Sequence, residues 1–301
     1  MNGSTIDTNP LFIVALDDRV DFCAEVLNTS GTPTAAEREQ AAGLKRLVFE
    51  GITAAVENGL AKSRVGIWAD SDLGESVLLR ARAMSMTAVS SPGSGAHALG
   101  KLNVDYTGVQ LIFNPDSPKE TRNELLARLK IVSDKARDES MPLLIELDAV
   151  PTPTQTEMYG GAQEARSMLL LAAVQQLQNS GVEPATWVFE PVADEKYTAA
   201  LAAQIHLDDR NNTRMLLLVS GDLAQGQVAT GLSAPEKQVV RLAARTHGVD
   251  GLLIGPGSYY RHLVQFNESL IERTVAIGAI ASYLNETDDI FEKSRAASKA
   301  L

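Results

Sequence analysis

The sequence is poor in the residues that build disulfides and basic surfaces. Cys23 is the only cysteine among 301 residues, so an intrachain disulfide cannot form and a cysteine-based zinc site has no partners. The formal net charge of -11, without any basic run, makes nucleic acid an unexpected partner, because phosphate binding needs concentrated lysine and arginine. No apolar stretch approaches the length of about 18 residues that a membrane span needs, and the start lacks signal-peptide features. We therefore expect a cytoplasmic protein without a membrane partner.

What the sequence does contain is an ordinary globular composition. Hydrophobic residues make up 45% of the chain and charged residues 22%, which is ample for a large core. A length of 301 residues suits an α/β barrel that folds as one unit. We expect a flexible N-terminal segment over residues 1–10 and a single barrel domain over residues 11–301.

Short apolar runs recur along the chain, and most are followed by a longer stretch of helical periodicity. This alternation is typical of parallel βα units, and runs that are apolar throughout are expected where both faces of a sheet are buried. Eight such runs favour closure into a (β/α)8 TIM barrel of the α/β class. A doubly wound open sheet is the alternative, but no glycine-rich nucleotide-binding loop follows the first run. The predicted strands cover residues 11–16, 65–69, 86–90, 109–113, 143–147, 186–190, 215–219 and 251–254.

The connections between these strands predict helices with two uncertain places. The third connection, around residues 96–102, is too short for a clear helix, and residues 151–161 look like a long loop at the catalytic mouth. Two helical stretches, residues 168–177 and 274–284, are apolar enough to be buried against the barrel or to form a subunit interface in a homo-oligomer. The predicted helices cover residues 35–58, 76–84, 119–138, 163–180, 194–207, 235–247 and 269–284.

Chemistry in a barrel lies at the C-terminal ends of the strands, so the polar residues there are the candidate site. Converging carboxylates can hold a divalent cation or act as a paired acid and base. A structural interpretation stays open, in which Arg19 pairs with Asp17, Glu146 or Glu190, or the carboxylates cap the following helices. The candidate catalytic residues are Asp17, Asp70, Glu146 and Glu190, and the candidate ligand-binding residues are Arg19, Asn114, Ser220, Gly255 and Gly257.

Histidine and lysine offer no further catalytic candidates. The four histidines fall on predicted helices or helix edges, which indicates helix-terminal or surface roles. A Schiff-base enzyme needs a lysine inside the barrel with a depressed pKa. Every lysine of this chain is predicted on a helix or loop, so no candidate for carbinolamine chemistry is found.

Seven motifs follow one another between about residue 11 and residue 291. They are VALDDR, ADSDLG, LIFNPDS, PLLIELDAVPT, GVEPATWVFEP, VDGLLIGPGSYY and the closing SYLNETDDIFEKS. In this order they resemble the 2-deoxy-5-keto-gluconate-6-phosphate aldolase-like family, whose barrel occurs alone or fused to a sugar kinase in inositol breakdown. The resemblance implies a class I aldolase-type barrel and a lyase that acts on a sugar or sugar phosphate.

The chain departs from this family at the positions that carry its chemistry. Asp18 lies where family members have histidine, and Gly108 and Val188 lie where they have lysines, the second being the Schiff-base position on the sixth strand. Ser220 and Pro256 lie near two family arginines. Each lost guanidinium contact to phosphate is worth on the order of 1.5–3 kcal/mol, so a strongly phosphorylated ligand is less expected.

Two functions therefore remain open at the level of sequence. The first is an aldolase-like lyase without Schiff-base chemistry, which works either with no cofactor or with a divalent metal such as magnesium or manganese as the carbonyl-polarising group. The second is a non-catalytic paralogue that binds a sugar-like ligand or a partner subunit. Fold alone does not decide between them.

Overall fold

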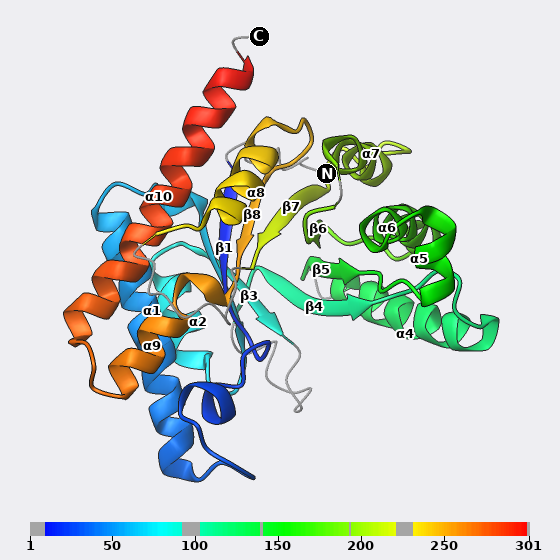
Figure 1. Ribbon diagram of the computed structural model, residues 1–301. Helices are drawn as coiled ribbons and strands as arrows, with labels where there is room; N and C mark the ends of the chain where they lie inside the picture. The colour runs from blue at the N-terminus through cyan, green and yellow to red at the C-terminus, as the bar shows by residue number, and fades with distance from the viewer. Residues whose placement is uncertain (1–9, 92–102, 139–140, 193, 221–230, 300–301) are drawn as a thin grey trace. The chain divides into compact units, whose positions relative to one another are not determined.

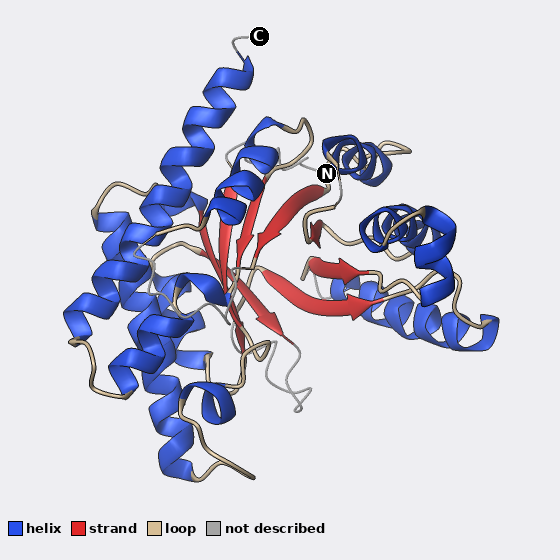
Figure 2. Ribbon diagram, in the orientation of Figure 1, coloured by secondary structure: helices blue, strands red, loops and turns tan. Residues whose placement is uncertain are grey.

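Eight parallel strands, in chain order, form a closed barrel. Helices lie in the described connections between the strands (Figures 1 and 2). This arrangement confirms the predicted (β/α)8 fold. The computed structural model describes residues 10–91, 103–138, 141–192, 194–220 and 231–299. The third connection, the first nine residues and residues 221–230 lie outside the described residues. In the described part, no helix is long and apolar enough to span a membrane.

The described residues divide into two compact units. The β1 unit comprises the described residues of Pro10–Asp105, Val219–Arg245 and Leu252–Leu301. The β5 unit comprises the described residues of Tyr106–Leu218 and Thr246–Gly251. The organisation as a single domain stays a prediction.

The strands of the β1 unit are β1 (Leu11–Leu16), β2 (Val65–Asp70), β3 (Thr87–Ser91) and most of β8 (Gly251–Ile254). All residues of β1 are buried, as expected for a strand covered on both faces. Leu16 pairs with Ala69, and Asp70 pairs with Ser91. This register brings Asp17, Asp70 and Ser91 to the same edge of the sheet.

The helices of this unit fall into short turns near the strand ends and longer covering helices. α1 begins with a capping box, in which Thr34 and Glu37 satisfy each other's backbone N–H groups. α10 packs along both α1 and α8. A Cβ atom on Gly51 of α1 would lie 2.6 Å from the Ile280 side chain, so glycine permits this close helix crossing. The helices are η1 (Phe22–Val26), α1 (Ala35–Glu57), η2 (Lys62–Arg64), α2 (Glu75–Ala83), α8 (Ala234–Arg245), η3 (Pro256–Ser258), α9 (Tyr260–Asn267) and α10 (Arg273–Lys299).

The β5 unit contains β4 (Tyr106–Ile112), β5 (Leu143–Asp148), β6 (Thr186–Phe189) and most of β7 (Arg214–Val219). In register, Gln110 lies opposite Glu146, and Glu146 lies opposite Val188. The helices of the unit are α4 (Lys119–Asp138), α5 (Pro153–Tyr159), α6 (Ala162–Asn179) and α7 (Glu195–Ile205).

Two short helices and one extension differ from the sequence-based expectation. The segment expected as a loop contains α5, which begins with Thr152 and Gln155 as a capping box and Pro153 in the first turn. α9 was not predicted. α10 continues past residue 284, and its Phe291 ring packs edge-on against Phe12 at 5.2 Å between centroids.

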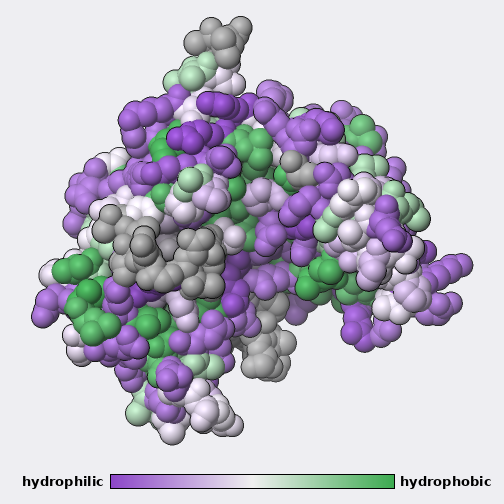
Figure 3. All heavy atoms as spheres, in the orientation of Figure 1, coloured by the Kyte–Doolittle hydropathy of each residue, from purple (hydrophilic) through white to green (hydrophobic). Residues whose placement is uncertain are grey.

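The two apolar helical stretches are mostly buried within their own units. Leu169, Leu170 and Val174 of α6 are buried, as are Ile280 and Leu284 of α10. On the face shown in Figure 3, hydrophilic residues predominate and hydrophobic areas are small and separated. Burial therefore accounts for most of this apolar character, and a homo-oligomer stays a prediction.

Candidate functional site

The predicted site residues fall into both units. Asp17, Arg19 and Asp70, together with Ser220, Gly255 and Gly257, belong to the β1 unit. Asn114, Glu146 and Glu190 belong to the β5 unit.

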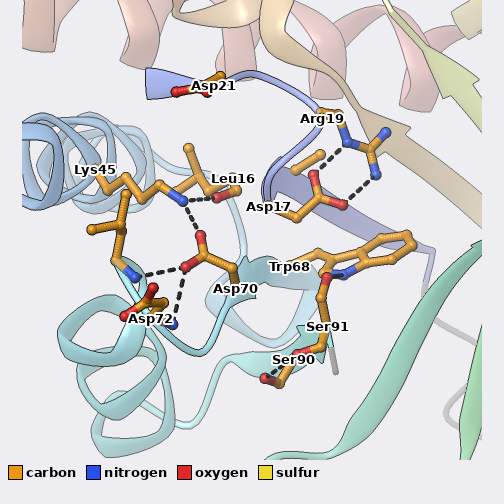
Figure 4. A network of polar contacts seen from close by, with 12 residues as sticks. Leu16, Asp17, Arg19, Asp21, Lys45, Trp68, Asp70, Asp72, Ser90 and Ser91 are labelled. Atoms are coloured by element: carbon orange, nitrogen blue, oxygen red, sulfur yellow. Dashed lines mark hydrogen bonds and ion pairs between the residues drawn. The ribbon is translucent and has the colours of Figure 1, made fainter. Parts of the chain in front are cut away.

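Asp17 and Arg19 form a bidentate ion pair directly after β1 (Figure 4). Arg19 donates from Nε to Asp17 Oδ1 at 2.5 Å and from its terminal nitrogen Nη2 to Oδ2 at 3.1 Å. The Asp17 side chain is only 1% exposed and that of Arg19 11%. The pairing of Arg19 with Asp17, one of the partners that the sequence left open, is thus present in the structure.

The aromatic face of Trp68 supports the Arg19 guanidinium from a second direction. The guanidinium carbon lies 5.1 Å from the ring centroid of Trp68, which is fully buried on β2. The indole N–H of Trp68 donates to Ser91 Oγ at 2.8 Å, which fixes the ring. Carboxylate pairing at the edge and stacking on the face hold the guanidinium in one plane.

Lys45 reaches the same strand ends from helix α1 (Figure 4). Its ammonium donates to the Leu16 carbonyl at 2.7 Å and to the Asp70 carboxylate. Lys45 lies on a helix, as predicted, yet its side chain is almost completely buried. The sequence contained a signal for this burial, because Ala41, Lys45, Val48 and Ile52 follow one another at helical spacing on the core face.

The environment of Asp70 keeps its carboxyl group ionised. Burial is the largest single effect and raises the pKa of Asp70, but Lys45 and the backbone N–H groups of Leu73 and Asp72 together lower it more. Those N–H groups donate to Oδ1 at 3.0 and 2.6 Å. The net pKa lies below the ordinary value, so Asp70 is a carboxylate at neutral pH and can accept a proton but has none to give.

The end of β8 is tied to the end of β7 through the backbone. The N–H of Gly255 donates to the Val219 carbonyl at 2.8 Å, and that of Gly257 donates to the Ser220 carbonyl at 3.1 Å. A Cβ atom on Gly255 would lie 3.0 Å from Ser220 Cα, so this close approach favours glycine. Both N–H groups are engaged within the chain, so a phosphate at this place would need other donors.

Tyr259, which follows η3, is a buried residue that the sequence did not single out. Its hydroxyl donates to the Ala15 carbonyl at 2.9 Å, and its ring stacks on Phe22 with centroids 6.0 Å apart. Burial raises the pKa of Tyr259 far above its usual range, and the Asp17 charge raises it further. The phenol therefore stays neutral and serves as a donor.

In the β5 unit, Arg166 of α6 ties the ends of β5 and β6 together. Its Nε donates to Asp148 Oδ1 at 2.6 Å, and its terminal nitrogen Nη1 donates to the Pro191 carbonyl at 3.1 Å. Its Nη2 lies 3.0 Å from Glu190 Oε2. Glu190 is thus half of an ion pair with a helix residue. Arg166 is the only cation in the apolar helix α6, which is the signal that could have identified it.

An amide network holds Asn114 in the same unit. Asn114 donates to Gln155 Oε1 at 2.9 Å and to the Val150 carbonyl at 3.0 Å. Gln155 in turn donates to Asp116 at 2.9 Å. Glu146 lies within β5, half-buried, and takes part in polar contacts of its own. The network joins the end of β4 to the start of α5.

The donor groups of the candidate site are not arranged as a metal site. Among the residues that the structure describes, no group of three or more histidine, cysteine, aspartate or glutamate side chains is placed to hold a metal ion. Asp17, Asp70 and Glu190 are instead paired with Arg19, Lys45 and Arg166, respectively. These three carboxylates do not form a magnesium or manganese site.

Comparison with known proteins identifies a fold and no family. No protein-family model matches the sequence, and no curated protein matches it. A crystal structure of Cgl0159 from Corynebacterium glutamicum (Brevibacterium flavum) is 14% identical, covers 94% of this chain and 88% of its own, and has a TM-score of 0.52. The YdjI aldolase from Escherichia coli K12 is 11% identical, with 94% and 92% coverage and a TM-score of 0.54. At such identities the likeness establishes the barrel fold alone.

Proposed function

We propose that this barrel binds a small anionic carbohydrate, a sugar phosphate or a sugar acid, at the ends of β1, β2 and β3, and acts on it as an aldolase-like lyase without a Schiff base. The observation that carries the proposal is the Asp17–Arg19 pair stacked on Trp68. A guanidinium fixed in a plane is suited to bidentate contact with a carboxylate or phosphate. Holding it rigid in advance lowers the entropic cost of binding.

The absence of a Schiff base is supported by the lysine positions. No strand in the described part of the chain carries a lysine, and Val188 occupies the sixth-strand position at which the resembled family has one. Among the described lysines, Lys45 is the one that contacts the strand ends of the candidate site, but its side chain is 1% exposed and its Nζ is bonded to Leu16 and Asp70. An amine must be accessible to attack a carbonyl, and Lys45 is not.

The remaining groups suit the steps of a retro-aldol cleavage. A base takes the hydroxyl proton, the carbon–carbon bond breaks, and its electron pair moves to the adjacent carbonyl as an enolate. We assign the base role to Asp17 or Asp70, either of which must release a bond to its own cation to accept the proton. Arg19 is the group that stabilises negative charge on the enolate oxygen or on the ligand anion.

The test is a thermal-shift titration with inorganic phosphate, a sugar phosphate and a sugar acid. A ligand at about 100 times its Kd adds roughly 2.7 kcal/mol to the unfolding free energy. R19K keeps the charge beside Asp17 but removes the planar fork, so we expect its affinity to fall about tenfold. R38K is the matched control, since Arg38 forms an exposed pair with Asp72 in the same unit. Equal stabilisation of wild type and R19K, or of neither, contradicts an Arg19 site.

Borohydride trapping tests the mechanism separately. We expect no mass increase when the protein is treated with borohydride and a sugar phosphate or keto acid. A trapped adduct on any lysine overturns the proposal of a reaction without a Schiff base. Cleavage of a sugar phosphate in the same samples at about 1 per second or faster supports the lyase.

The second candidate, a non-catalytic binding protein, is favoured by one observation. Arg166 engages both Asp148 and Glu190, so carboxylates at two strand ends serve as structural anchors. Anion binding that depends on Arg19, without turnover of any sugar phosphate or sugar acid, decides for this alternative.

A further inference from the structure

We infer that Lys45 is a positioning residue. From helix α1 it fixes the five-residue segment Asp17–Asp21, and thereby the Arg19 guanidinium. The inference deepens the proposed anion site and rests on it for the ligand-binding consequence. Lys45 does not touch the ligand in this account. Its effect passes through the backbone of β1 and the side chain of Phe22.

Lys45 contacts the residues at both ends of the segment that carries Arg19. Its ammonium donates to the carbonyl of Leu16, directly before Asp17, at 2.7 Å. The same ammonium lies 4.9 Å from the ring centroid of Phe22, directly after Asp21. Lys45 therefore fixes both the backbone at which the segment leaves β1 and the side chain at which it enters η1.

A second buried side chain holds the preceding carbonyl. Tyr259 donates to the carbonyl of Ala15 at 2.9 Å and stacks on the same Phe22 ring. The last two carbonyls of β1 are thus bonded by Lys45 and Tyr259, which come from α1 and from the turn after β8. This double anchoring leaves the backbone before Asp17 little freedom.

The partner carboxylate connects Lys45 to the surface on which Arg19 stacks. Asp70 is the last residue of β2, and Trp68 lies two residues earlier on the same strand. Asp70 also accepts the N–H groups of Asp72 and Leu73, which fixes the turn after β2. Lys45 therefore holds the Arg19 segment and the Trp68 strand in one arrangement (Figure 4).

A purely structural ion pair and a positioning residue predict different outcomes for an apolar replacement. Replacing a buried pair by apolar residues of similar volume is often neutral or stabilising. K45M/D70L removes both charges together, so it can restore folding stability. It cannot restore the bond to the Leu16 carbonyl, because methionine has no donor. In K45M/D70L we therefore expect the free energy of unfolding to recover, while the position of the Arg19 guanidinium stays changed.

The experiment records ¹H–¹⁵N spectra of the full chain without any ligand. The chain has two tryptophans, so W187F assigns the Trp68 indole N–H signal, and R19K assigns the Arg19 Nε–H signal. In K45M/D70L we expect both signals to shift or broaden, and phosphate affinity to fall about tenfold, as for R19K. Y283F is the control, because it removes a different buried contact of the β1 unit, the 2.6 Å bond to Glu236, and should leave both signals in place.

Two single variants keep the test decisive if the double variant fails to fold. D70N keeps Lys45 and its bond to Leu16, so the Arg19 signal should stay. K45Q shortens the side chain and should move the signal. Unchanged signals in folded K45M/D70L or K45Q, or an equal change in D70N, overturn the inference. If wild type binds no anion, the proposed function fails, yet the ligand-free spectra still decide the role of Lys45.

Discussion

Both units pair an arginine with carboxylates at their strand ends, but the more buried member of the pair differs between them. After β1, Asp17 is the buried member at 1% exposure and Arg19 the outer member at 11%. After β5 and β6, Arg166 is the buried member at 10%, while Asp148 and Glu190 are 35% and 48% exposed. Arginine is thus the more exposed member of the pair after β1, and the carboxylates are the more exposed members after β5 and β6.

This inversion follows from where each arginine lies in the sequence. Arg19 is in the loop directly after its strand, so its side chain lies over the strand end and its partner is beneath it. Arg166 is on the helix after β5, and its side chain approaches the strand ends from the helical layer. Arg19, which lies in a loop and is held by Asp17, is suited to contact a ligand. Arg166, which lies on a helix and binds two carboxylates, is suited to join neighbouring strands.

The largest expected effect comes from breaking the buried Lys45–Asp70 pair of the β1 unit. K45M leaves the Asp70 carboxylate buried without its cation, and we expect the free energy of unfolding to fall by about 3–5 kcal/mol. Urea denaturation measures this change. K293M, at a side chain 75% exposed, is the control and should have little effect. A loss below about 1 kcal/mol for K45M contradicts a buried pair.

The corresponding change in the β5 unit should reduce stability without affecting the ligand. R166M removes the charged hydrogen bonds to Asp148 and the contact with Glu190, and we expect a loss of about 2–3 kcal/mol. Phosphate affinity, measured by the same thermal-shift titration, should not change. R128M, which alters an exposed pair on α4, is the control. A large loss of phosphate affinity in R166M refutes the division of roles between the two arginines.

The fold was predictable because its signals are local. Apolar runs such as residues 11–16 and 143–147 coincide with β1 and with the first five residues of β5, since buried parallel strands need continuous hydrophobic residues. Short helices were less visible. α5 depends on a capping box within a segment rich in proline and threonine, and α9 is a single amphipathic piece of eight residues.

Residues of the candidate site could be predicted from the sequence only where they directly follow a strand. That rule located Asp17, Arg19 and Asp70, whose side chains do meet supporting groups at the strand ends. It could not locate Lys45 or Arg166, because charges on helices are usually solvated and their burial depends on tertiary packing. Lys45 and Arg166, the partners of Asp70 and Glu190, are indicated in the sequence only by their places on apolar helix faces, and the structure is needed to show which carboxylates they meet.

A smaller, pH-dependent effect should distinguish Asp70 from its amide analogue. The pKa of Asp70 is lowered in the folded protein, so its ionisation stabilises the fold above the unfolded value of about 3.9. We expect D70N to be less stable than wild type by about 1–2 kcal/mol near neutral pH. As pH falls below about 4 and through the lower folded-state pKa, the difference should shrink. Urea titrations between about pH 3 and 7 measure it, and a difference independent of pH contradicts the assigned ionisation.

The smallest expected effect concerns an exposed ion pair. It tests whether burial or distance determines how much a pair such as Asp17–Arg19 contributes to stability. The Arg38–Asp72 pair has the same closest distance of 2.5 Å, but its side chains are 42% and 64% exposed. Water and salt screen such a pair, so R38Q should change the unfolding free energy by about 0.5 kcal/mol or less, and less still at high salt. Thermal or urea denaturation at low and high salt measures this change. A loss of unfolding free energy as large as that expected for R166M would show that an exposed ion pair stabilises this protein as much as a buried one. Burial would then not explain why the Asp17–Arg19 pair differs from pairs on the surface.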